Sequence, residues 1–112
     1  MRLPSYLELD EIILAADSFA ILKTVQSVIR SDLTCEQKIS YLSDFFGRIQ
    51  SAIEMKTFAA EQLRVIIAAA REQIASLQKE INLKKDQIAA LELNKLRDLL
   101  QEELIKLELA YN

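Results

Sequence analysis

Positions spaced at alternating steps of three and four residues run from Ile39 to Leu91 without a change of phase, and fourteen of these sixteen positions are apolar. Lysine interrupts this register only at Lys56 and Lys84. A seven-residue apolar repeat of this length is typical of helices that pack lengthwise against other helices. The repeat therefore predicts a chain that folds, and acts, through contacts between helices. The positions are Ile39, Leu42, Phe46, Ile49, Ile53, Lys56, Ala60, Leu63, Ile67, Ala70, Ile74, Leu77, Ile81, Lys84, Ile88 and Leu91.

The composition of the 112 residues favours helices throughout a single domain. Apolar residues make up 51% of the chain, which is enough to build a core and argues against disorder. One glycine and one proline leave little turn punctuation, and the sequence contains no Asn-Gly or Asp-Gly hairpin signal. We predict one all-α domain that spans residues 1–112.

Two capping boxes, at Ser5 and at Thr34, mark the starts of the first two predicted helices. The first predicts a helix over about residues 6–30. After the second no clear stop occurs, because the single glycine costs only about 1 kcal/mol in a helix interior. The register then predicts one helix over about residues 35–91, a rod of roughly 85 Å.

The register fails after Leu91. A last apolar stripe follows with a displaced phase, which predicts a kink or turn around residues 92–95 and a C-terminal helix over about 96–110. The orientation of this helix is open, because it can fold back on the rod or present a groove-binding face. The stripe consists of Leu93, Leu96, Leu100, Leu104, Leu107 and Tyr111.

The leading architecture is a helical hairpin whose long second helix forms a coiled coil with a second copy. Another position of the heptad, the one that Ile66 and Gln73 share, is apolar up to Ile66 and polar from Gln73 onward. Only the first half of the rod therefore needs contact with a third helix. The first helix, folded back, supplies that cover. We therefore expect an oligomeric helical bundle, a homodimer with parallel or antiparallel pairing. Its predicted seam consists of Phe46, Ile49, Ile53, Leu63, Ile67, Ile74, Leu77, Ile81, Ile88 and Leu91.

A compact alternative stays open. The polar run from Asn82 to Gln87 permits a turn, which would give an antiparallel three- or four-helix bundle within one chain. The unbroken phase of the register on both sides of this run favours the long rod, since a loop has no reason to preserve phase. Helix continuity through residues 82–87 therefore separates the two architectures.

The residue types that most enzyme chemistry requires are missing. The chain has no histidine and one cysteine, Cys35, which excludes a structural zinc site and the usual catalytic triads. One glycine leaves no phosphate-binding loop. The adjacent Glu102 and Glu103 point to different helix faces and make no carboxylate pair. We predict a non-enzymatic protein that needs no cofactor or metal, with Cys35 an inert residue in the first turn of a helix.

Features of the chain favour an intracellular setting. A single cysteine suits a reducing compartment, and Pro4 with the acidic residues that follow it argues against a signal peptide. The apolar stretches are too short or too interrupted to span a bilayer. We expect a soluble, cytoplasmic protein, or one internal to a virus-like particle.

The leading functional prediction is a protein–protein interaction module, such as a small scaffold, adaptor, or binding chaperone or inhibitor. Such a protein would pack a partner's helix against an apolar helical surface. The candidate partner surface consists of Phe58, Val65, Ile66, Leu93, Leu96, Leu100, Leu104, Leu107 and Tyr111.

A regulator that contacts nucleic acid or its machinery is the alternative prediction. Residues 63–85 carry five basic and two acidic side chains, while the net charge of the whole chain is −3. Binding through these cations would weaken steeply as salt is added. They are Arg64, Arg71, Lys79, Lys84 and Lys85.

Overall fold

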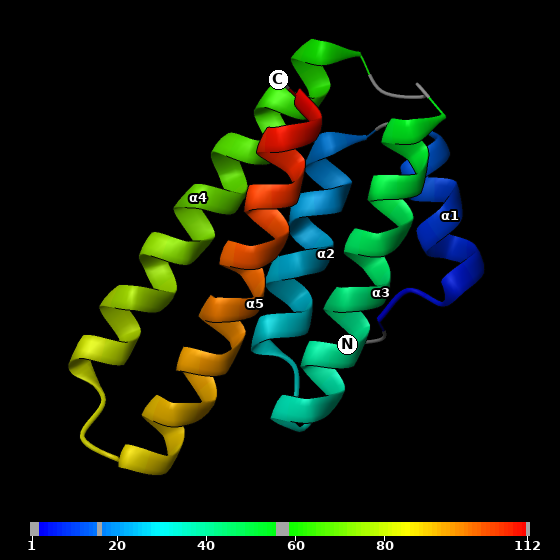
Figure 1. Ribbon diagram of the computed structural model, residues 1–112. Helices are drawn as coiled ribbons and strands as arrows, with labels where there is room; N and C mark the ends of the chain where they lie inside the picture. Colours follow the sequence, from blue (N-terminus) through cyan, green and yellow to red (C-terminus); the bar gives the residue numbers. More distant parts are fainter. Residues whose placement is uncertain (1–2, 16, 56–58, 112) are drawn as a thin grey trace.

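Four of the described helices begin after a residue whose side chain accepts a hydrogen bond from a free N–H group of the first turn. Ser5 Oγ accepts from Glu8 N–H at 3.3 Å, and Thr34 forms a reciprocal capping box with Gln37. Both predicted N-termini are thus confirmed. The computed structural model describes residues 3–15, 17–55 and 59–111, and in them the helices are α1 (Tyr6–Leu14), α2 (Ser18–Arg30), α3 (Cys35–Glu54), α4 (Ala60–Leu83) and α5 (Gln87–Tyr111) (Figure 1).

The single helix predicted over residues 6–30 is wrong. α1 ends at Leu14, and Asp17 caps the start of α2 by accepting from Ala20 N–H at 3.1 Å. An aspartate in this place satisfies a free amide of the second helix and so stabilises the break. The division lets α1 turn away and pack on α3, where it also touches α2.

The prediction of one continuous helix over residues 35–91 is wrong, because among the described residues three helices cover this range. α3 runs through Gly47, as expected, and is followed by Met55, whose N–H donates to Ser51 O at 3.0 Å. α4 begins after Ala59, whose N–H donates to Gln62 Oε1 at 3.1 Å. Position Lys56 of the register lies outside the described residues.

A second reversal separates α4 from α5 within the polar run that permitted a turn. Lys84 has an extended backbone, with φ −74° and ψ 129°. Asp86 starts the next helix, because its side chain accepts from Ile88 N–H at 2.9 Å and its carbonyl accepts from Ala90 N–H at 3.0 Å. Residues 84–86 therefore form a short hairpin turn.

α5 continues without a break from this turn to Tyr111. The kink predicted at residues 92–95 and the separate helix predicted over 96–110 are therefore wrong. The apolar stripe of α5 is out of phase with the register before it for another reason. Once the chain reverses, a different face of the helix is the one that meets α3 and α4.

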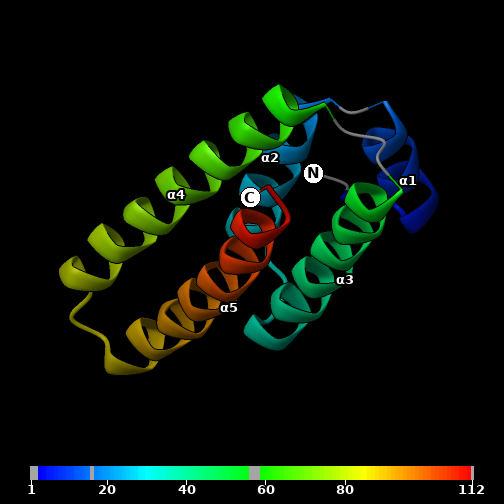
Figure 2. The same ribbon diagram turned by 45° about the horizontal axis from the view of Figure 1, so that its top comes forward.

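The protein is an all-α bundle, the compact alternative. α5 packs against both α3 and α4, and α2 packs against the same two helices (Figures 1 and 2). α1 lies outside this group of four, next to α3. The longest dimension is 43 Å, so the predicted rod of roughly 85 Å is wrong. The described residues contain no strand.

The residues predicted to form an intermolecular seam lie mostly in the core of one chain. Phe46, Ile49, Leu63, Ile67 and Leu77 are buried there. Ile53 and Ile74 pack against that core, Ile81 is partly buried, and Ile88 and Leu91 are exposed. The continuous helix that the seam required is absent, because the reversals bring the same apolar faces together within the chain.

Leu100 and Leu109 allow a matched test of this packing, since both are leucines of α5 with opposite exposure. Leu100 is 2% exposed and Leu109 is 72% exposed. We expect Leu100→Ala to lower the free energy of unfolding by about 2–5 kcal/mol through lost burial and a cavity. Leu109→Ala should change it by less than about 0.5 kcal/mol. Urea denaturation of both variants checks this, and equal losses would contradict the packing described.

Candidate functional site

Most of the predicted partner surface faces inward. Ile66, Leu96, Leu100 and Leu107 are buried, and Leu93 and Leu104 pack against the core. Val65 is 42% exposed. Phe58 and the side chain of Tyr111 lie outside the described residues. The predicted surface is therefore wrong for the stripe on α5, because that stripe fills the bundle.

A different stripe of α5 is exposed along its whole length. It continues the register past Leu91 in steps of four and three, and each of its residues is exposed. Its two ends are apolar and its centre is charged. We call it the outer stripe, and it consists of Ile88, Leu91, Lys95, Asp98, Glu102, Ile105 and Leu109.

The outer stripe carries large apolar side chains in water. Ile88 is 72% exposed, Leu91 57%, Ile105 58% and Leu109 72%. Sequence reasoning stopped at Leu91 because the next positions are charged. The sequence could have identified Ile105 and Leu109, because both lie at the three- and four-residue spacing of the register when it is extended through the charged positions. Apolar residues at helical spacing that a fold leaves uncovered suit the binding of another helix.

An open groove of about 600 Å³ lies beside the centre of this stripe, between α3 and α5. Ile39 and Leu99 provide apolar walls and themselves pack against the core. The charged residues of the outer stripe form part of the same groove. The groove is lined by Ile39, Lys95, Asp98, Leu99, Gln101, Glu102 and Ile105.

The α4–α5 turn carries a further uncovered side chain. Leu83, the last residue of α4, is 81% exposed. Lys84 and Lys85 follow it and are also exposed. Figure 1 shows this turn, in yellow, standing away from the other loops of the bundle. With Ile88 just beyond it, the turn is flanked by an apolar residue on each side.

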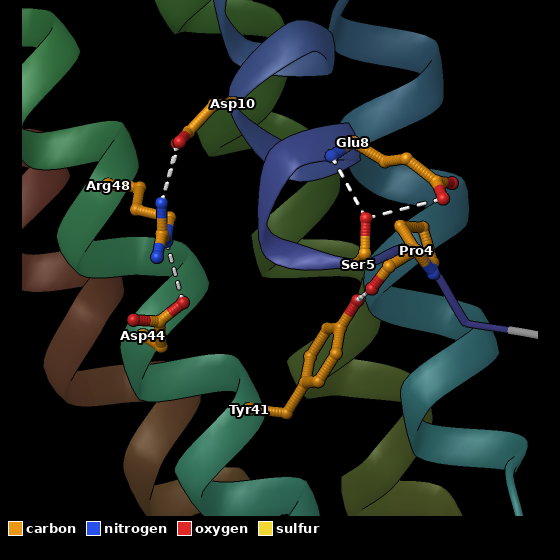
Figure 3. Close-up of polar contacts among 7 residues, drawn as sticks. All are labelled: Pro4, Ser5, Glu8, Asp10, Tyr41, Asp44 and Arg48. Carbon is orange, nitrogen blue, oxygen red and sulfur yellow. Dashed lines mark hydrogen bonds and ion pairs between the residues drawn. The ribbon is translucent and has the colours of Figure 1, made fainter.

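The densest polar cluster joins α1 to α3 (Figure 3). Arg48 Nη1 donates to both carboxylate oxygens of Asp10, at 2.7 and 2.8 Å, and Arg48 Nε donates to Asp44 at 2.7 Å. The guanidinium also lies 4.9 Å from the centre of the Tyr6 ring. The hydrogen bonds to Asp10 and Asp44 raise the pKa of Arg48, so it remains a cation. The cluster attaches α1 and offers no free acid or base.

Tyr41 completes the attachment of α1 from α3. Its hydroxyl donates to Pro4 O at 2.6 Å, as Figure 3 shows. Burial raises the pKa of Tyr41, and the nearby Glu8, Tyr6 and Asp44 raise it further. The phenol therefore serves as a neutral hydrogen-bond donor.

Cys35 lies in the first turn of α3, where a helix dipole would favour a thiolate. Its surroundings act in the opposite direction. Burial raises the pKa of Cys35, and the negative charge of Glu92 raises it further. The Sγ–H group also donates to Glu92 O at 3.5 Å. These contacts favour the protonated thiol.

The five cations of the alternative prediction are not all free. Arg64 pairs with Glu61 at 2.7 Å, and Arg71 pairs with Glu108 at 3.0 Å. Lys79, Lys84 and Lys85 are exposed. Pairing of two of the five with carboxylates reduces the positive field that this surface can present.

The described residues hold no group of histidine, cysteine or acidic side chains placed to bind a metal ion. Glu102 is exposed and Glu103 is buried, so the two carboxylates diverge as expected. Among the described helices none is both long and apolar enough to cross a membrane. Comparison with family models, with curated proteins and with solved structures finds no match.

Tyr41→Phe should lower the free energy of unfolding by about 1 kcal/mol at neutral pH, because one hydrogen bond is lost. The folded protein raises the pKa of Tyr41 above its usual 10.0. The contribution of the Tyr41 hydroxyl to the free energy of unfolding is therefore full below pH 10.0, and it declines as pH rises through the raised pKa. The wild type should lose its advantage over Tyr41→Phe in that alkaline range. Urea denaturation of wild type and Tyr41→Phe at a series of pH values checks this. An advantage that grows with alkali would contradict it.

Cys35 should react with maleimide more slowly in the folded protein than in urea, because its raised pKa lowers the thiolate fraction. Glu92→Gln removes one of the charges that raise this pKa and should speed the reaction of the folded protein. Stopped-flow alkylation at neutral pH measures both rates. A folded protein that reacts as fast as the unfolded chain would show that these surroundings do not protect the thiol.

Proposed function

We propose that this protein is a non-enzymatic protein-interaction module that binds a helix of another protein along the outer stripe of α5. The observation that carries the proposal is the exposure of Ile88, Leu91, Ile105 and Leu109 at the spacing of one helix face. The sequence also lacks the histidine and glycine-rich motifs on which most enzyme chemistry depends.

The chemistry of the outer stripe describes the partner it would take. Apolar residues at both ends call for apolar residues at matching spacing on the partner helix. At the centre, Lys95, Asp98 and Glu102 call for a partner segment of mixed charge, since unlike charges fix the register and like charges exclude wrong partners. The groove beside Leu99 would accept one larger apolar side chain. A scaffold, an adaptor and a small binding chaperone all use contacts of this kind.

We also propose that the protein works as a homodimer in the cytoplasm. The cytoplasmic location is supported by the single cysteine, which suits a reducing compartment. The homodimer is supported by apolar residues of the seven-residue register that the fold leaves uncovered, Ile88 and Leu91. Two copies joined through Ile88 and Leu91 would each still present the other end of the outer stripe, with Ile105 and Leu109, and this would strengthen binding to a partner with two sites.

Ile105→Lys tests the binding proposal, because it places a charge on the outer stripe at a residue that is 58% exposed. The change should leave thermal stability nearly unaltered and abolish capture of partner proteins from an extract of the source cells. Ala75→Lys, on the exposed face of α4, is the matched control. Quantitative mass spectrometry compares the proteins captured by each. The same set captured by wild type and Ile105→Lys would overturn the proposed binding surface.

A further inference from the structure

Two opposite charges at the centre of the outer stripe have no ion-pair partner in the described part of the chain. Other charged residues of α5 are paired within it: Lys106 pairs with Glu103 at 3.3 Å, and Glu108 pairs with an arginine of α4 at 3.0 Å. Lys95 and Glu102 are exposed, and among the described residues neither forms an ion pair. They lie seven residues apart, about two helical turns, on one face of α5. Both charges are therefore open to a second molecule.

The outer stripe is nearly symmetric in spacing about its central residue, Asp98. Lys95 lies three residues before Asp98, and Glu102 lies four residues after it. The apolar residues lie ten and seven positions before Asp98 and seven and eleven positions after it, and they are Ile88, Leu91, Ile105 and Leu109. The stripe is thus apolar at both ends, with unlike charges on the two sides of its centre. This is the pattern that a partner helix for the stripe would need, read in the opposite direction.

A second copy in antiparallel orientation would match every part of this pattern. A two-fold axis near the centre of the stripe places the same surface of both copies in contact. Lys95 of each copy then faces Glu102 of the other, which makes two ion pairs, and Ile88 of each copy lies against Leu109 of the other. A parallel pair would set lysine against lysine and glutamate against glutamate, and like charges disfavour that arrangement.

At the two-fold axis, Asp98 of one copy approaches Asp98 of the other. A cation of the same chain offsets this pair of like charges, because Arg97 Nη2 donates to Asp98 Oδ1 at 3.0 Å and Arg97 Nε donates to it at 3.3 Å. Arg97 is itself held by α4, since its Nη1 donates to Gln78 Oε1. Each aspartate at the axis therefore brings its own positive charge.

We propose that two copies of this chain pair antiparallel along the full outer stripe, with Lys95 of each copy bound to Glu102 of the other. This inference rests on the proposed homodimer and specifies its geometry. It differs from a contact limited to the Ile88 end of the stripe, because the pairing also covers Ile105 and Leu109. The second copy then occupies the surface offered to a partner helix. A partner must displace it, so dimerisation regulates access to the stripe.

Charge reversal tests the pairing. Lys95→Glu and Glu102→Lys each break both ion pairs and place like charges opposite each other, so each should weaken dimerisation at least about tenfold. The double variant restores unlike charges in every facing pair and should dimerise about as well as wild type. Sedimentation equilibrium over a range of concentrations measures the dissociation constants, and circular dichroism establishes that each variant is folded.

Glu72→Lys is the matched control, because Glu72 is an exposed residue of α4 and the substitution changes the net charge by the same amount as Glu102→Lys. It should leave dimerisation unaltered. Wild-type dimers that Glu102→Lys leaves intact would overturn the pairing. A double variant no stronger than the single variants would overturn it as well.

Cross-linking reports the direction of the pair without a change of charge. Ile88→Cys and Leu109→Cys, each in a Cys35→Ser background and one with a longer tag, are mixed and treated with a short bis-maleimide. We expect covalent dimers that contain one copy of each variant. Dimers linked only between two Ile88→Cys copies would overturn the antiparallel pairing and leave a homodimer joined at that end standing. A wild type that stays monomeric at every concentration would overturn the homodimer too.

Discussion

Burial of the inner face of α5 against α3 and α4 is the contact on which the rest of the fold depends. Leu96, Leu100 and Leu107 are each no more than 2% exposed, and they meet faces of α3 and α4 that would otherwise lie in water. This face reaches α4 only because the chain reverses at residues 84–86. Reversal covers most of the register positions of α3 and α4 within one chain, without the loss of translational freedom that a second copy requires. The compact bundle follows from that advantage.

The same reversal creates the surface that makes the protein a candidate for binding. A helix that buries one face must present another, and on α5 the presented face has Ile88 and Ile105 near its two ends. The ends of this face would add affinity through apolar burial, and its charged centre would add selectivity. α1 is attached in two ways, by the burial of Leu9 and Ile13 in the core and by the ion pairs of Arg48 and the hydroxyl of Tyr41. Because exposed ion pairs contribute modestly, the two buried side chains supply most of this attachment.

Sequence reasoning succeeded where a local interaction decides the structure. The caps at Ser5 and Thr34 were predicted because the bonding partners lie three residues away. Gly47 was expected to leave its helix intact, and it does. The break at Asp17 was missed, although its cap is equally local, because the apolar spacing continues on both sides. Partner residues on α5 were misplaced for a related reason, since periodicity shows that a helix has an apolar stripe and not what covers it.

Local sequence patterns are sufficient to show that this chain is helical, where two of its helices begin, and that its apolar residues lie on helix faces at a seven-residue spacing. These properties depend on contacts between residues a few positions apart. The packing of the whole chain establishes that the long register is divided among α3, α4 and α5 and that Ile49 and Leu77 share one core. The physical reason is that a heptad face can be covered equally well by the same chain or by another. The choice between them depends on long-range packing and on the entropy of association, which no local pattern contains.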